Sequence, residues 1–151
     1  MDSVSDTARA LLTFALLSST ALGVYVWKLS RLDAAGPDRL VGLLRLAQWA
    51  ALVLAALGAV SIGSTIAHEA APLGTIEVTL GLAFIVIGAV VLHREPREAL
   101  LLAAGAFVLH ALVTLAHRPN GLPPIAPAWY TAGSAIYDLF FAAACYWARR
   151  Q

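Results

Sequence analysis

Two histidines and two carboxylates are the residues whose types could carry chemistry in this sequence: Glu77, His110, His117 and Asp138. Each lies inside or at the end of a long apolar stretch. Imidazole and carboxylate groups exchange protons readily, so Asp138, His110 and Glu77 are candidate catalytic acids and bases. The same groups ligate divalent transition metals, which makes all four residues candidate metal ligands and such an ion the candidate cofactor.

The spacing of the two histidines limits what they can do alone. His110 and His117 are seven residues apart, which places them on one helical face about 10 Å from each other. One metal ion would therefore need ligands from another helix. No H-E-x-x-H or Glu-x-x-His motif is present, and the single cysteine, Cys145, makes a thiolate site unexpected.

Asp138 is the residue that we consider most informative, because placing an acid inside an apolar membrane segment costs free energy. It could accept a proton or hold a cation, or it could bond to Ser134 or Tyr137 and simply hold helices together. Its charge state depends on how far it lies from His110. Glu77 falls in the first turn of its expected helix, where an acid also favours the helix dipole.

The composition points to lipid as the surrounding medium. Of 151 residues, 60% are hydrophobic and only 13% are charged, and the mean hydropathy is +0.79. Soluble domains carry about 25% charged residues, and a small fold cannot hide this much apolar surface. The net charge of +1 excludes a nucleic-acid footprint. We predict one polytopic membrane domain over residues 1–151.

Five apolar segments approach the roughly 20 residues that cross a bilayer, and all seven prolines fall between them. The sequence therefore predicts an all-α integral membrane bundle of about five transmembrane helices. Their expected ranges are Ala10–Leu29, Leu46–Ala67, Thr75–Leu92, Ala99–Ala116 and Ala128–Ala148.

Basic residues flank one side of the expected membrane far more often than the other. This asymmetry predicts the N-terminus outside and the C-terminus in the cytoplasm. Richness in alanine, leucine and arginine favours a bacterial cytoplasmic (inner) membrane. The cytoplasmic set is Lys28, Arg31, Arg39, Arg45, Arg94, Arg97, Arg149 and Arg150, and the outer set is Arg9 and Arg118.

The ionisable residues within the spans gather in the outer half of the expected bundle. His68 and Glu69 lie at the same outer rim, and the proline-rich segment 118–127 is expected to cover it as a rigid lid. We predict that Glu77, His110 and Asp138 converge beneath this segment in a shallow cavity open to the outside. On the first helix only Thr13, Thr20 and Trp27 suggest a polar face.

Three functions are compatible with this arrangement. In the first, the cluster binds a metal ion or relays protons. In the second, a His/carboxylate pair acts as general acid and base on a lipid or isoprenoid substrate, which requires a cavity of at least about 300 Å³. In the third, the chain is an accessory or channel-forming subunit, or a homo-oligomer that meets its partner through the glycine-lined third segment (Gly81, Gly88).

Overall fold

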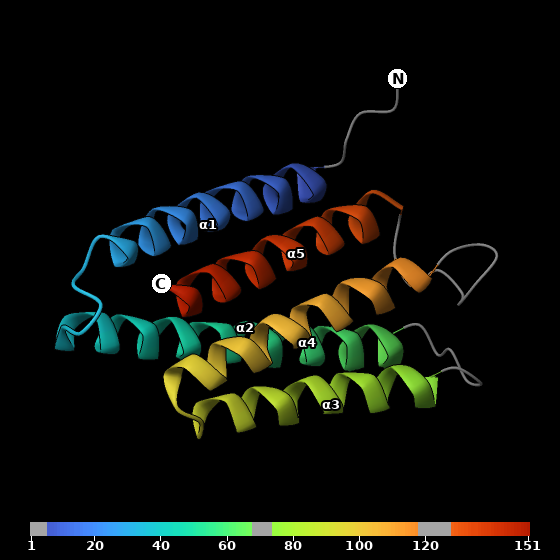
Figure 1. The fold of residues 1–151 in the computed structure, drawn as a ribbon. Coiled ribbons are helices and arrows are strands. Elements are labelled where there is room, and N and C mark those ends of the chain that lie inside the picture. The colour runs from blue at the N-terminus through green and yellow to red at the C-terminus, as the bar shows by residue number, and fades with distance from the viewer. Residues whose placement is uncertain (1–5, 68–73, 118–127) are drawn as a thin grey trace.

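The protein is an all-α bundle of five helices, as predicted (Figure 1). The computed structural model describes residues 6–67, 74–117 and 128–151. The helices are α1 (Asp6–Ser30), α2 (Pro37–Ala67), α3 (Gly74–Leu92), α4 (Pro96–Ala116) and α5 (Ala128–Arg150).

The helices extend past the predicted apolar segments at several ends. The largest difference is at α2, which begins at Pro37 instead of Leu46. Proline is favoured in the first turn of a helix, and Asp38 beside it favours the helix dipole. Pro96 begins α4 in the same way. Charged residues in the first turns of α2, such as Asp38 and Arg39, moved the predicted start of the apolar segment to Leu46, although the helix is already formed and partly buried before that residue.

The helices lie side by side and alternate in direction (Figure 1). The α1–α2 turn, the α3–α4 turn and the C-terminus lie at one end of the bundle, which we call the basic end. Helix α2 packs most extensively on α3, and α4 on α5, whereas α1 rests mainly on α5.

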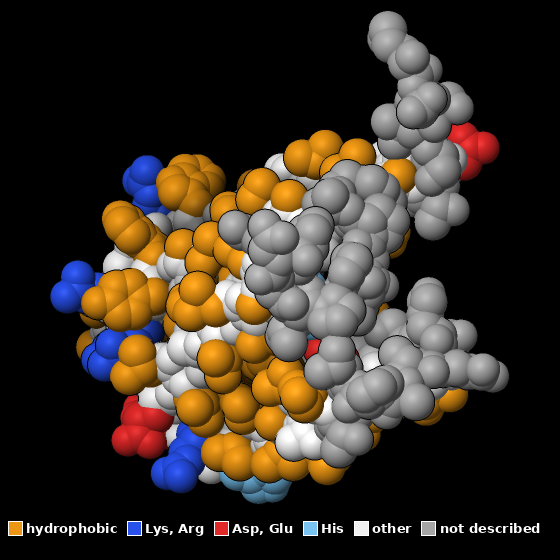
Figure 2. Space-filling view, turned by 90° about the vertical axis from the view of Figure 1, so that its right-hand side faces the viewer, with side chains coloured by type: hydrophobic (Ala, Val, Ile, Leu, Met, Phe, Trp, Pro, Cys, Tyr) orange, Lys and Arg blue, Asp and Glu red, His pale blue; other side chains and the backbone are white. Residues whose placement is uncertain are grey.

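In the described part of the chain, three helices are long and apolar enough to cross a membrane: Ala8–Ser30, Pro37–Gly63 and Pro96–Ala116. Helix α3 adds a shorter apolar stretch, Ile76–Leu92, and α5 carries Asp138 within its continuous length. Leucine, valine and phenylalanine side chains are exposed along the bundle, and hydrophobic side chains cover much of the face in Figure 2. An apolar surface of this extent indicates a lipid environment. The prediction of five crossings and the predicted orientation remain predictions.

Helices α2 and α3 approach so closely that their backbones touch. A β-carbon on Gly58 would collide with the carbonyl oxygen of Gly81, and one on Gly81 would lie 2.7 Å from the carbonyl oxygen of Gly58. One on Gly88 would lie 2.8 Å from that of Ala51. The glycines of α3 therefore form an interior contact. Their suggested role as an oligomer interface is wrong, because they are already covered within the chain.

The half of the bundle toward the basic end is filled by small and apolar side chains. Leu100, Ala103 and Cys145 are fully buried there, and the ring of Phe107 lies 5.1 Å from that of Phe141. Among the described residues, Arg39 is the buried charged group at this end, and its guanidinium donates to the carbonyl of Leu32 over 3.4 Å. It lies beside the α1–α2 turn and not deep within the bundle.

Candidate functional site

Helix α4 positions both candidate histidines on its inner face. His110 and His117 are 7% and 5% exposed, respectively, so neither reaches the surrounding medium to any extent. His117 is therefore buried within the bundle although it lies directly after the last residue of α4. Each imidazole meets a carboxylate from a different neighbouring helix, which we call the deep pair (His110 and Asp138) and the shallow pair (His117 and Glu77).

The deep pair joins α4 to α5. His110 Nδ1 lies 2.6 Å from Asp138 Oδ2, and Asp138 is 0% exposed. The ring of Phe84 from α3 packs edge-on against the imidazole, with 5.0 Å between the ring centroids. The prediction that Asp138 and His110 meet is confirmed, and hydrophobic side chains shield their hydrogen bond.

The second oxygen of Asp138 is the unusual feature of the deep pair. Asp138 Oδ1 is buried and has no hydrogen-bond partner among the described residues. An unsatisfied buried polar atom costs about 1–3 kcal/mol, and more when it carries charge. The suggested bonds from Ser134 or Tyr137 do not supply this partner. The carboxyl group is thus only half satisfied in a medium that penalises charge.

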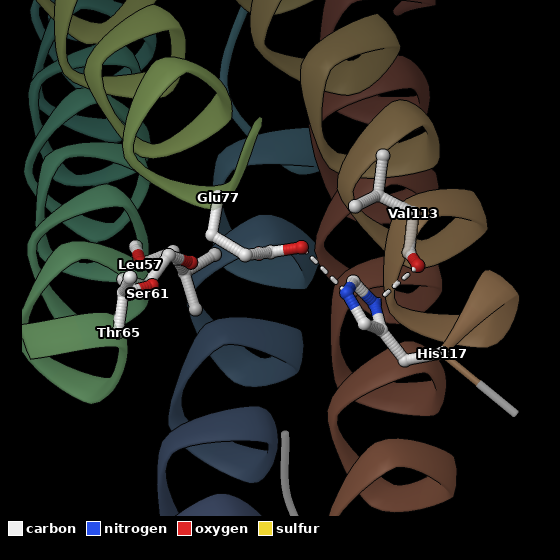
Figure 3. A network of polar contacts seen from close by, with 6 residues as sticks. All are labelled: Leu57, Ser61, Thr65, Glu77, Val113 and His117. Carbon is white, nitrogen blue, oxygen red and sulfur yellow. Dashed lines mark hydrogen bonds and ion pairs between the residues drawn. The ribbon is translucent and has the colours of Figure 1, made fainter. Parts of the chain in front are cut away.

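The shallow pair joins α4 to α3, where Glu77 reaches across from the first turn of its helix (Figure 3). His117 Nε2 lies 2.6 Å from Glu77 Oε1, and His117 Nδ1 lies 2.9 Å from the carbonyl oxygen of Val113. A carbonyl only accepts, so Nδ1 must carry a proton and donate it. Nε2 and Oε1 are then left to share one further proton, as imidazolium with carboxylate or as imidazole with carboxylic acid.

The predicted convergence of Glu77, His110 and Asp138 at one point is wrong. Glu77 pairs with His117 instead, because α3 and α5 lie on different sides of α4 and each supplies one acid. Within residues 6–67, 74–117 and 128–151, no group of three His, Cys, Asp or Glu side chains could hold a metal ion. The predicted ligands therefore form two pairs and not a metal-binding cluster. His68, Glu69 and the predicted lid at 118–127 lie outside the described residues.

A cavity of about 220 Å³ opens between α1 and α5, beside Tyr130, Ser134 and Tyr137. It is smaller than the roughly 300 Å³ of a typical ligand pocket. Neither His110 nor Asp138 lines it. The lipid-enzyme hypothesis thus gains no substrate chamber at the deep pair from this cavity.

The polar contact that attaches α1 involves Ser18, a residue that was not among those predicted. Ser18 Oγ lies 3.1 Å from the hydroxyl of Tyr137 on α5. The predicted residues Thr13 and Thr20 instead donate to carbonyls of their own helix, at 2.9 and 2.8 Å. Ser18 lies one and three turns before Leu22 and Leu29, which face the core. That helical spacing places Ser18 on the core-facing side of α1 and could have identified it from the sequence.

No family model, curated protein or solved structure matches the chain. Its function is therefore inferred from the two histidine–carboxylate pairs.

Proposed function

We propose that this membrane protein takes up and relays protons through the outer half of its bundle, with Asp138 as the terminal acceptor. The observation that carries the proposal is the 2.6 Å contact between His110 Nδ1 and the fully buried carboxyl group of Asp138. A contact this short lets one proton reside on either atom, depending on the state of the other.

The surroundings of the deep pair favour the binding and release of a proton as its functional step. A net charge inside a bilayer costs at least about 2.5–3.5 kcal/mol, so the pair is most stable when it is neutral as a whole. Loss of one proton leaves a net negative pair, and no donor from the described part of the chain then stabilises Asp138 Oδ1. Proton binding is thus coupled to a large change in local electrostatic energy.

The shallow pair supplies a route toward the deep pair. Glu77 and His117 already share a proton across 2.6 Å, and they lie nearer the end of the bundle opposite the basic end. The seven-residue separation on α4 corresponds to about 10 Å, which is wider than one hydrogen bond. Transfer between the pairs therefore requires at least one intervening water molecule.

Beyond Asp138 the path is expected to stop. The next inward-facing residues of α5 are Phe141 and Cys145, packed against Phe107 and Leu100 of α4 in an apolar core. We therefore expect reversible uptake from one side of the membrane and no steady proton current. Metal binding by His110, His117, Glu77 and Asp138 is the weaker candidate, since each described pair offers only two ligands.

Protonation of Asp138 can be measured by infrared difference spectroscopy on the protein in nanodiscs while the pH is changed. We expect a carboxylic-acid C=O band that disappears in Asp138→Asn, together with the loss of one titrating proton per chain. The asparagine amide keeps a hydrogen bond to His110, so the fold should persist. Glu98→Gln is the matched control, because Glu98 is an exposed acid in the first turn of the neighbouring helix α4, at the basic end of the bundle.

A spectrum in which Asp138→Asn and the unaltered protein titrate alike would overturn the proposal. Sidedness is tested with proteoliposomes of known orientation, in which uptake should follow the pH on the side of Glu77. Tight stoichiometric zinc binding that depends on both histidines would favour the metal-binding alternative.

A further inference from the structure

The basic end of the bundle carries a feature that the proton-relay proposal does not use. An open groove of about 930 Å³ runs along α4, beside the end of α3 and the last turn of α5. Leu101, Gly105 and Leu109 line its apolar length. Glu95, Arg97, Glu98 and Arg149 line its charged mouth.

Gly105 lies in the lining of the groove, at an open point on the surface of α4. A β-carbon at Gly105 would meet nothing within 4 Å, in contrast to Gly81 and Gly88, whose faces are filled by α2. Gly105 also borders a second apolar groove, of about 470 Å³, on the α5 side of α4. The surface of α4 is thus hollowed on both sides of this residue, within the part of the helix that is apolar enough to lie in the membrane.

The charged residues at the mouth are not paired with one another. Among the described residues, the ion pairs are Asp6 with Arg9 and the two histidine–carboxylate pairs. Arg97 and Arg149 therefore present two guanidinium groups without carboxylate partners, and Glu95 and Glu98 present two carboxylates without cationic ones. By contrast, the neighbouring Arg150 lies over the ring of Tyr146, 5.1 Å from its centroid.

We propose that this groove binds a phospholipid whose headgroup carries both a phosphate and a primary ammonium group. Guanidinium groups bind phosphate oxygens through two parallel hydrogen bonds, which assigns the phosphate to Arg97 and Arg149. The ammonium group donates to Glu95 or Glu98. An acyl chain lies over Gly105, along Leu101 and Leu109.

The mixed charge of the mouth sets the specificity. An anionic headgroup without an amine would satisfy the arginines but would face two unpaired carboxylates, which disfavour it. A trimethylated ammonium group carries charge but cannot donate a hydrogen bond to them. The site should therefore prefer phosphatidylethanolamine over both phosphatidylglycerol and phosphatidylcholine with the same acyl chains.

Native mass spectrometry of the protein, released from nanodiscs containing equal amounts of these three lipids, tests the preference. We expect phosphatidylethanolamine to be retained about tenfold more than the other two. The double variant Arg97→Gln/Arg149→Gln should lose this retention by about tenfold or more. The matched control is Arg31→Gln/Arg45→Gln, which removes two basic residues from the same end but none from the groove.

A second pair of variants separates groove filling from misfolding. Gly105→Phe should abolish selective retention, whereas Gly63→Phe should preserve it, because Gly63 is equally open but lies on α2 away from the groove. Glu95→Gln/Glu98→Gln should shift the preference toward phosphatidylglycerol.

Equal retention of all three lipids by the unaltered protein would overturn the proposal, as would equal losses in the Gly105 and Gly63 variants. A dimer that Gly105→Phe dissociates would also overturn it, since the groove would then be an interface between copies of this chain. None of these outcomes bears on Asp138, so the two proposals stand or fall separately.

Discussion

The two halves of the bundle solve the same packing problem in different ways. Toward the basic end, α4 and α5 meet through Leu100, Ala103 and Cys145, and no acid or imidazole of the described residues is buried between them. In the other half, the same α4 meets its neighbours through two buried imidazole–carboxylate contacts of 2.6 Å. A buried ion pair is often no more stabilising than hydrophobic residues of similar volume. Because apolar packing suffices in one half, stability alone does not explain the polar pairs in the other.

The two pairs also differ from each other in how completely they are satisfied. In the shallow pair, both ring nitrogens of His117 have partners, one of them the carbonyl of Val113. In the deep pair, one carboxylate oxygen of Asp138 has no partner within residues 6–67, 74–117 and 128–151. The shallow pair therefore resembles a well-bonded helix contact, whereas the deep pair contains a buried carboxylate oxygen that lacks a hydrogen-bond donor among the described helices. Four variants test these contrasts.

The largest loss of stability is expected for His110→Ala. It leaves the buried Asp138 carboxyl without its described partner, which typically costs about 3–5 kcal/mol when a buried charge pair is broken. The free energy of unfolding in mixed detergent measures the loss. Adding Asp138→Asn should recover part of it, because the amide carries no charge. A loss below about 1 kcal/mol would mean that the pair is dispensable for packing.

Leu100→Ala probes the apolar half and should lower the free energy of unfolding by about 2 kcal/mol, because it leaves a cavity between α4 and its neighbours. Leu101→Ala is the matched control, since Leu101 is 44% exposed and should change stability little. The same unfolding assay measures both. Proton uptake should be unaffected by Leu100→Ala. A loss of uptake would contradict the view that only the half with the polar pairs takes part in it.

Glu77→Gln should have a smaller effect, about 1 kcal/mol, because the amide can still donate to His117 Nε2. Its functional effect should be kinetic: stopped-flow proton uptake slows, while the Asp138 band still titrates fully. Complete loss of that titration would show instead that the two pairs act as one unit.

Tyr137→Phe removes only the hydroxyl that meets Ser18, and interhelical bonds of this kind average about 0.6 kcal/mol in membrane proteins. Hydrogen exchange of α1 should rise, because this helix rests mainly on α5. Tyr146→Phe, on an exposed tyrosine of the same helix, is the control. Unchanged exchange in α1 would show that apolar contacts alone hold it.

The sequence by itself determined the class of the protein, the approximate helix positions and the depth of the polar residues. These features depend on how each residue type by itself tolerates lipid. The sequence shows them as apolar runs of spanning length, prolines between the runs, and acids and histidines gathered in one half. The meeting of His110 with Asp138 could also be predicted, because both lie at similar depth and neither charge tolerates hydrocarbon alone.

Only the tertiary structure decided which partner each group takes. Glu77 meets His117 and not the deep pair because the close glycine contact of α2 with α3 fixes where α3 lies around the bundle. Ser18 and not Thr13 meets α5 because the rotation of α1 is set by its packing. Depth in a membrane can be read along one helix, but rotation and neighbour choice depend on how all the helices fill space together.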